Sequence, residues 1–252
     1  MPDLTQKDKF IIYCTPRSGS YLLVDLINNI PSVKCYGELF KPHGYDLGPG
    51  FLKSHNLNYS CAKRDKQPFK FLEDLYNVTQ EKKIGFKIFP SHHKWVFNNY
   101  LKNVKVKKII LYRPVIDVYI SLQNAKHSNV WITKNNSSDN RKTFTLDLDH
   151  FERYNHRHTK YYTHLKDKLS IEDQKYLWIA YKDLIKKGPV MESLSTFIDP
   201  SSTNINWKSD LKKQVKSYKK LLQNYDESIE FFNKNYTDEF AESALGIEYA
   251  QK

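Results

Sequence analysis

The stretch that decides the fold is IIYCTPRSGSYLLVDLI, residues Ile11–Ile27. It opens with an apolar run of β-branched and aromatic residues, which is typical of a buried strand. It closes with apolar residues at helical spacing, which indicates a helix. Only the short polar segment TPRSGS separates the two. The stretch therefore predicts a strand that turns at once into a helix, over a hydroxyl-rich corner that carries one Arg.

The same alternation of strand and helix continues along the chain. It is typical of an α/β fold, here a three-layer sandwich with a central, mostly parallel sheet flanked by helices. In such a sheet, ligands bind beyond the carboxyl ends of the strands. The predicted strands are Lys9–Cys14, Val33–Tyr36, Lys82–Phe89, Val104–Tyr112 and Gln174–Tyr181.

The remaining segments are expected to be helices and two long loops, Lys41–Lys66 and Asn129–Asn140. No linker divides the chain, so we expect a single domain over residues 1–252. Its core covers about residues 9–200, and a helical, polar extension covers about 206–252. The predicted helices are Ser20–Asn29, Pro68–Asn77, Ser91–Lys102 with Ser91 as its cap, Pro114 to about Ala125, and Leu148–Leu169.

The chain of 252 residues carries a formal net charge of +12. Such an excess favours anionic partners, although a surface simply rich in Lys produces it too. Three cysteines, Cys14, Cys35 and Cys61, match no disulfide framework and no metal-ligand spacing, which fits a reducing compartment. The polar N-terminus is not typical of a secretory signal, and no window is apolar enough to span a membrane. We therefore expect a cytoplasmic protein.

The corner Thr15–Ser20 has the chemistry of an anion site. A helix N-terminus presents unpaired N–H groups and partial positive charge, and a tight loop before it surrounds an anion with donors. Gly19 lets the backbone come close, and Ser18 adds a hydroxyl. Arg17 can bind two oxygens at once. The corner lacks the Lys of the standard NTPase loop. The alternative reading is a serine-rich turn with a surface Arg.

A second corner follows the strand that ends at Tyr112. Arg113 stands at the strand end, and Pro114 opens a helix. Ser121 lies eight residues after Arg113, about two helical turns on. The alternative is that Arg113 pairs with Asp117 while Ser121 faces solvent. Together the two corners predict a ligand with two anionic ends, such as a nucleotide with a 3′-phosphate and a 5′-phosphosulfate.

At these residues the sequence resembles the sulfotransferases that use 3′-phosphoadenosine 5′-phosphosulfate (PAPS). TPRSGSYLL resembles their 5′-phosphosulfate loop at Arg17, Gly19 and Ser20. Arg113 and Ser121 resemble their 3′-phosphate motif. ISLQNAKHSNVW and IAYKDLI are similar to segments of the bacterial carbohydrate sulfotransferases, which include trehalose 2-sulfotransferase and the nodulation-factor sulfotransferases. The resemblance covers about residues 9–200.

The resemblance implies a P-loop NTPase-like fold, PAPS as donor, adenosine 3′,5′-bisphosphate (PAP) as product and no metal. The acceptor is expected to be a hydroxyl compound, with carbohydrate favoured by the family, and no nucleic acid partner is expected. The oligomeric state cannot be read from the sequence. The implied donor-binding residues are Thr15, Pro16, Arg17, Ser18, Gly19, Ser20, Tyr21, Arg113 and Ser121.

Sulfuryl transfer needs stabilised charge on the leaving oxygen and a base for the acceptor proton. Arg17 and the loop N–H groups suit the first task. Glu38, just after the second predicted strand, is the candidate base, and the resemblance supports it. His92 and His93, after the third strand, are its rivals, because a His is the base in cytosolic sulfotransferases.

Several residues have open roles. Lys87 either points to the sulfonate or extends to the surface, and Trp131 either covers the adenine or acceptor or belongs to the core. Tyr21 replaces a small hydroxyl residue of the family, so a contact to the 5′ end of the donor is lost or lengthened. Arg141 and Lys142 lack the Gly of the family's R-K-G loop, which puts the third contact to the 3′-phosphate in doubt.

Two other classes of protein remain as alternatives. A P-loop kinase for a small molecule needs a Lys after the second Gly and depends on Mg²⁺, and the sequence lacks that Lys. A basic nucleic-acid-binding protein needs basic and stacking residues gathered on one face, whereas here they are spread along the chain.

Overall fold

The computed structural model describes residues 7–132, 143–170, 173–211 and 217–245. The chain forms two compact units, each with a buried apolar core of its own. The single domain expected from the sequence stays a prediction. The first unit comprises residues up to Thr15, Gly19–Tyr112 and Leu165–Ser209, and the second comprises Pro16–Ser18, Arg113–His164 and the chain from Asp210.

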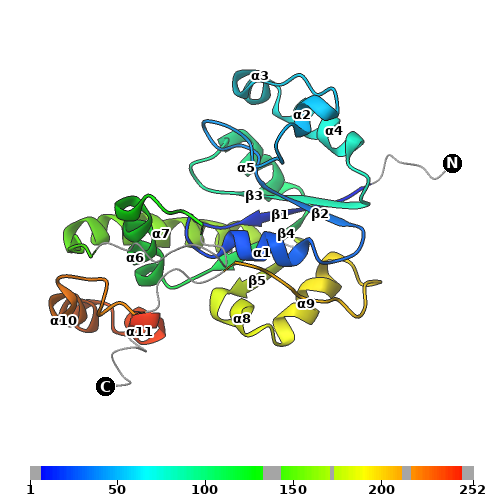
Figure 1. The fold of residues 1–252 in the computed structure, drawn as a ribbon. Helices are drawn as coiled ribbons and strands as arrows, with labels where there is room; N and C mark the ends of the chain where they lie inside the picture. The colour runs from blue at the N-terminus through cyan, green and yellow to red at the C-terminus, as the bar shows by residue number, and fades with distance from the viewer. Residues whose placement is uncertain (1–6, 133–142, 171–172, 212–216, 246–252) are drawn as a thin grey trace. The chain divides into compact units, whose positions relative to one another are not determined.

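The first unit is built on a five-stranded sheet in which every pairing is parallel, in the order β2-β3-β1-β4-β5 (Figure 1). Because all strands run the same way, their carboxyl ends lie at one edge, where the residues after β1, β2 and β3 are brought together. The predicted parallel sheet is confirmed. The strands are β1 Asp8–Tyr13, β2 Val33–Glu38, β3 Lys83–Ile88, β4 Lys107–Tyr112 and β5 Tyr176–Ala180.

Helices cover both faces of this sheet. Side chains alternate between the two faces along β1, and its residues Phe10–Tyr13 are all buried, so both faces must be covered. Phe10 and Ile12 belong to a core with α1 Ser20–Ile27, α8 Tyr181–Lys186 and α9 Pro189–Ile198. On the opposite face, Tyr13 packs edge-on against Phe97, with ring centroids 4.8 Å apart. The elements on that face include α4 Pro68–Val78 and α5 Lys94–Lys102. The three layers that the sequence predicts are therefore present.

The second unit is helical. Its core combines one face of α6 with rings from α7 and the C-terminal part of the chain. Asp117 ties these parts together, because it accepts hydrogen bonds from the Tyr218 hydroxyl at 2.9 Å and the Ala244 N–H at 3.0 Å. The helices are α6 Val115–Ser128, α7 Leu148–Leu169 (up to His164 in this unit), α10 Tyr225–Asn235 and α11 Thr237–Glu242.

Four details differ from the sequence-based expectations. The expected loop Lys41–Lys66 contains two short helices, α2 Phe51–Ser54 and α3 Cys61–Lys66, and the Ser60 side chain caps the second. Helix α5 begins at Lys94, and its cap is His93 rather than Ser91. Among the described residues after Asn206, the first helix is α10, which begins at Tyr225. Strand β2 extends through Glu38, so the candidate base is the last residue of a strand.

No helix in the described ranges is long and apolar enough to cross a bilayer.

Candidate functional site

The turn between β1 and α1 has the backbone geometry that the sequence predicts. Arg17 and Gly19 both adopt positive φ, 68° and 92°, so the chain reverses within a few residues before α1 begins at Ser20. A Cβ on Gly19 would lie 2.4 Å from the ring of Tyr181, so only glycine fits here. Gly19 provides no side-chain cap to α1. This backbone geometry is compatible with the anion site that the sequence predicts.

Three of the predicted anion-binding residues contact one another within the second unit. Arg17 donates through Nε to the Ser121 hydroxyl at 3.1 Å, and Arg113 donates through Nη1 to the Arg17 carbonyl at 3.0 Å. Arg113 and Ser121 are buried. The structure thus brings together two cations and a hydroxyl that are distant in sequence, a set suited to an anion.

The alternative reading of the second corner is half right. Arg113 Nε lies 3.8 Å from Asp117 Oδ2, so the expected ion pair exists, although at long range. Ser121 does not face solvent. Trp131 is 48% exposed, so it is not a core residue, and its carbonyl accepts a hydrogen bond from Arg17. Arg141 and Lys142 lie outside the described residues.

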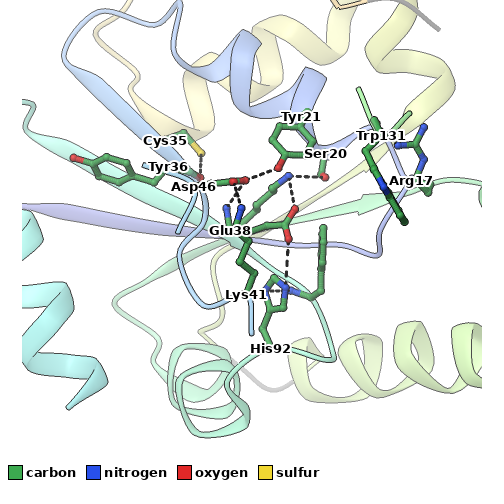
Figure 2. Close-up of polar contacts among 12 residues, drawn as sticks. Arg17, Ser20, Tyr21, Cys35, Tyr36, Glu38, Lys41, Asp46, His92 and Trp131 are labelled. Atoms are coloured by element: carbon green, nitrogen blue, oxygen red, sulfur yellow. Dashed lines mark hydrogen bonds and ion pairs between the residues drawn. The ribbon is translucent and has the colours of Figure 1, made fainter. Parts of the chain in front are cut away.

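In the first unit, the candidate base stands in a buried cluster of charges (Figure 2). Glu38 Oε1 lies 3.1 Å from Lys87 Nζ, and Glu38 Oε2 lies 3.5 Å from His92 Nε2. The register between β2 and β3 places Glu38 beside Lys87 after an irregularity at the end of β2. Lys87 is 0% exposed and donates to the Ser20 hydroxyl at 3.3 Å. Lys87 therefore points into the cluster and does not extend to the surface.

The two rival bases, His92 and His93, are both engaged in hydrogen bonds. His92 Nδ1 accepts the N–H of Phe89 at 3.2 Å, so the neutral ring carries its proton on Nε2, which faces Glu38. His93 accepts the Val96 N–H as the cap of α5, and its Nε2 donates to the Asp65 carbonyl. Neither imidazole has a lone pair left for a substrate proton in this arrangement, whereas the Glu38 carboxylate has.

The charges around Glu38 set its protonation state. Burial raises the pKa of Glu38, but the hydrogen bond from His92 and the Lys87 charge outweigh burial, so the pKa lies below its ordinary value. Burial lowers the pKa of Lys87, and the Glu38 charge opposes that shift. Glu38 is consequently a carboxylate at neutral pH, the form in which it can accept a proton.

Sequence reasoning missed Asp46, which lies in the segment expected to be a loop. Its carboxylate accepts the Glu38 N–H at 3.1 Å and the Tyr21 hydroxyl, and its other oxygen binds Lys41 at 2.7 Å. The Tyr21 hydroxyl is therefore engaged by a carboxylate, while the Tyr21 ring lies 3.0 Å from Lys87 Nζ. The signal in the sequence was that Asp46 lies between Gly44 and Gly48, in a stretch where the backbone can adopt unusual conformations.

Among the described residues, no group of three or more His, Cys, Asp or Glu side chains is placed to hold a metal ion. The residues that the sequence assigns to donor binding divide as follows in the structure: Thr15, Gly19, Ser20 and Tyr21 belong to the first unit, and Pro16, Arg17, Ser18, Arg113 and Ser121 to the second.

Comparison with known proteins identifies the family. The model of the sulfotransferase domain family matches residues 7–243. Nodulation protein H of Rhizobium tropici is 22% identical over 235 residues, which make up 89% of this chain and 89% of that protein.

Solved structures are also similar. A sulfotransferase from Alicyclobacillus acidocaldarius matches with a TM-score of 0.47 and 12% identity, over 93% of this chain and 95% of that one. A mouse sulfotransferase complexed with PAP matches with a TM-score of 0.43 and 14% identity, over 97% of this chain and 88% of that one. The family match alone spans most of the sequence. This chain belongs to the sulfotransferase domain family and is a PAPS-dependent sulfotransferase.

Proposed function

We propose that this enzyme moves the sulfuryl group of PAPS to a hydroxyl of a carbohydrate acceptor, with Glu38 as the general base. The observation that carries the proposal is the pair of contacts on Glu38, with Lys87 on one oxygen and the protonated Nε2 of His92 toward the other. Carbohydrate as the acceptor rests on the sequence segments that resemble the bacterial carbohydrate sulfotransferases. A cytoplasmic location and a reaction without metal belong to the same proposal.

The donor is bound by the residues that the sequence assigns to its two anionic ends. Arg17, Gly19 and Ser20, within the loop Thr15–Tyr21, bind the 5′-phosphosulfate through side chains and the N-terminus of α1. Arg113 and Ser121 bind the 3′-phosphate. The burial of both residues supports this assignment, because water competes poorly for a charge-assisted hydrogen bond that is shielded from solvent.

The reaction is a single displacement at sulfur. The acceptor oxygen forms a bond to the sulfur atom, and the bond from sulfur to the bridging oxygen of the 5′-phosphate breaks. Glu38 takes the hydroxyl proton, and PAP leaves with the electron pair of the broken bond. Lys87 and Ser20, which contact each other, stabilise negative charge that develops on the transferred group and the leaving oxygen.

The test is transfer from ³⁵S-labelled PAPS to a panel of oligosaccharides, phenols, peptides with Tyr and simple alcohols, without added metal. The proposal expects labelled product with an oligosaccharide, formed about 10²- to 10⁴-fold more slowly by the Glu38→Gln variant. Transfer to phenols or Tyr peptides alone would overturn carbohydrate as the acceptor. Absence of any transfer and of PAP binding would overturn the reaction itself.

A further inference from the structure

The Glu38 cluster is closed by two residues that the reaction itself does not require. Tyr21 is the second residue of α1, and Asp46 lies in the segment after β2. The Tyr21 hydroxyl donates to Asp46, and Asp46 accepts the N–H of Glu38. The face of the Tyr21 ring lies 3.0 Å from Lys87 Nζ. Lys87 in turn contacts the Glu38 carboxylate, so the four residues form a closed ring of contacts.

The backbone is arranged to admit Asp46 to this ring. Its N–H donates to the Glu38 carbonyl at 3.1 Å, and its carboxylate accepts the Glu38 N–H at 3.1 Å, so one main-chain and one side-chain hydrogen bond join the two residues. A Cβ on Gly37 would lie 2.5 Å from the Asp46 side chain, so only a glycine beside Glu38 leaves room for the carboxylate. Lys41 neutralises the other Asp46 oxygen at 2.7 Å. The Asp46 carboxylate is thereby fixed in one position.

The aromatic ring has a separate effect, on the lysine. A fully buried ammonium loses its hydration and needs compensating contacts. The face of an aromatic ring attracts a cation, and the attraction strengthens where water is excluded. The Tyr21 ring, the Ser20 hydroxyl at 3.3 Å and the Glu38 carboxylate at 3.1 Å together define the position of Lys87.

We propose that Tyr21, acting through Asp46 and Lys87, is a positioning residue that holds the Glu38 carboxylate in its reacting orientation. Its hydroxyl fixes the Glu38 main chain by way of Asp46, and its ring fixes the cation that binds the Glu38 side chain. This inference rests on the proposed function of Glu38, and it gives the bulky residue at this loop position a task other than binding the donor.

The test separates the two contacts of Tyr21. Tyr21→Phe keeps the ring under Lys87 and removes the hydroxyl from Asp46. Tyr21→Leu removes both contacts. Since Tyr21 also lines a pocket of about 340 Å³, the Phe variant has the further merit of keeping the wall of that pocket. Tyr59→Phe is the matched control, because it removes another Tyr–Asp hydrogen bond of the same unit, to Asp74 at 2.7 Å.

The readout is the titration midpoint of the Glu38 carboxyl, followed by carbon-13 NMR on the ligand-free protein. When Tyr21 no longer positions Lys87 and the Glu38 main chain, Glu38 loses stabilisation of its charged form, and its midpoint rises. We expect a rise of roughly half a pH unit or more in Tyr21→Phe and a larger rise in Tyr21→Leu. Among the described residues, the charged or titratable groups that face Glu38 are Lys87, His92, Tyr21 and Asp46, and Lys41 pairs with Asp46.

An unchanged midpoint in Tyr21→Phe overturns the proposal, and so does an equal rise in Tyr59→Phe. Once an acceptor substrate is identified, we also expect kcat of Tyr21→Phe to fall about tenfold or more while the KM for the acceptor changes little. The failure of the proposed function would look different. Wild-type protein would then neither bind PAP nor transfer sulfate, whatever the Glu38 midpoint does.

Discussion

Glu38 is the residue on which the proposed chemistry depends. Replacing it by Gln keeps the shape of the side chain and removes the group that accepts the proton. We expect Glu38→Gln to lower kcat by about 10²- to 10⁴-fold, the usual contribution of a general base, and to leave the Kd for PAP within about threefold of wild type. Glu73→Gln is the control, because the Glu73 side chain is exposed and pairs with Lys70 on the surface. Unchanged turnover of Glu38→Gln would remove Glu38 as the base.

The acid side of the pH profile tests the charges around Glu38. Its folded-state pKa is depressed, since His92 and Lys87 outweigh burial, so the reactive carboxylate is present above that pKa and is lost as pH falls through it. We expect kcat/KM, which reports the free enzyme, to fall on the acid side with a midpoint below 4.5, the ordinary value. A midpoint above 4.5 would contradict the arrangement.

The same depression links Glu38 to stability. A carboxyl with a lowered folded-state pKa contributes stability that is fully present above its unfolded pKa. That contribution disappears as pH falls through the lowered value. Acid unfolding of Glu38→Gln, followed by circular dichroism, should therefore depend less on pH below about 4.5 than acid unfolding of the wild-type protein does.

At the scale of elements, the turn between β1 and α1 depends on glycine. Gly19 has a φ of 92°, and a Cβ at this position would lie 2.4 Å from the Tyr181 ring. We expect Gly19→Ala to destabilise the protein by about 1–3 kcal/mol in urea unfolding and to weaken PAP binding, because the loop must move away from Tyr181. Gly48→Ala is the control, since a Cβ there meets nothing within 4 Å. Equal effects of the two variants would show that the turn tolerates a side chain.

Elements with a long periodic pattern could be predicted from the sequence. Helix α7 has the predicted bounds, and β1, β3 and β5 lie within two residues of theirs. The cap of α5 could not be predicted, because residue type favours Ser91 and the observed cap is His93. The helices α2 and α3 are short, and Arg64 in α3 is buried against the carbonyls of Leu39 and Gly44. Such a helix depends on packing, which a local pattern does not report.

At the scale of the whole molecule, the sequence predicts candidate residues but not the contacts between them. It singled out Glu38, Arg17, Arg113 and Ser121 from strand ends and spacing. It left Lys87 undecided and missed Asp46. Both depend on the register between β2 and β3 and on the path of the chain after β2, which are long-range features. The alternation of side chains along a strand predicts on which face of the sheet Lys87 lies. It does not predict which residues Lys87 contacts there.

The central claim is that the two corners bind one doubly anionic nucleotide, and calorimetric titration with PAP tests it most directly. The titration compares wild type, Arg113→Ala and the exposed control Arg157→Ala, each with and without Mg²⁺. The account predicts that wild type and Arg157→Ala bind PAP equally well without Mg²⁺, and that Arg113→Ala binds roughly 10- to 100-fold more weakly. Binding of ATP–Mg²⁺ in preference to PAP, or equal binding of PAP by all three proteins, would contradict it.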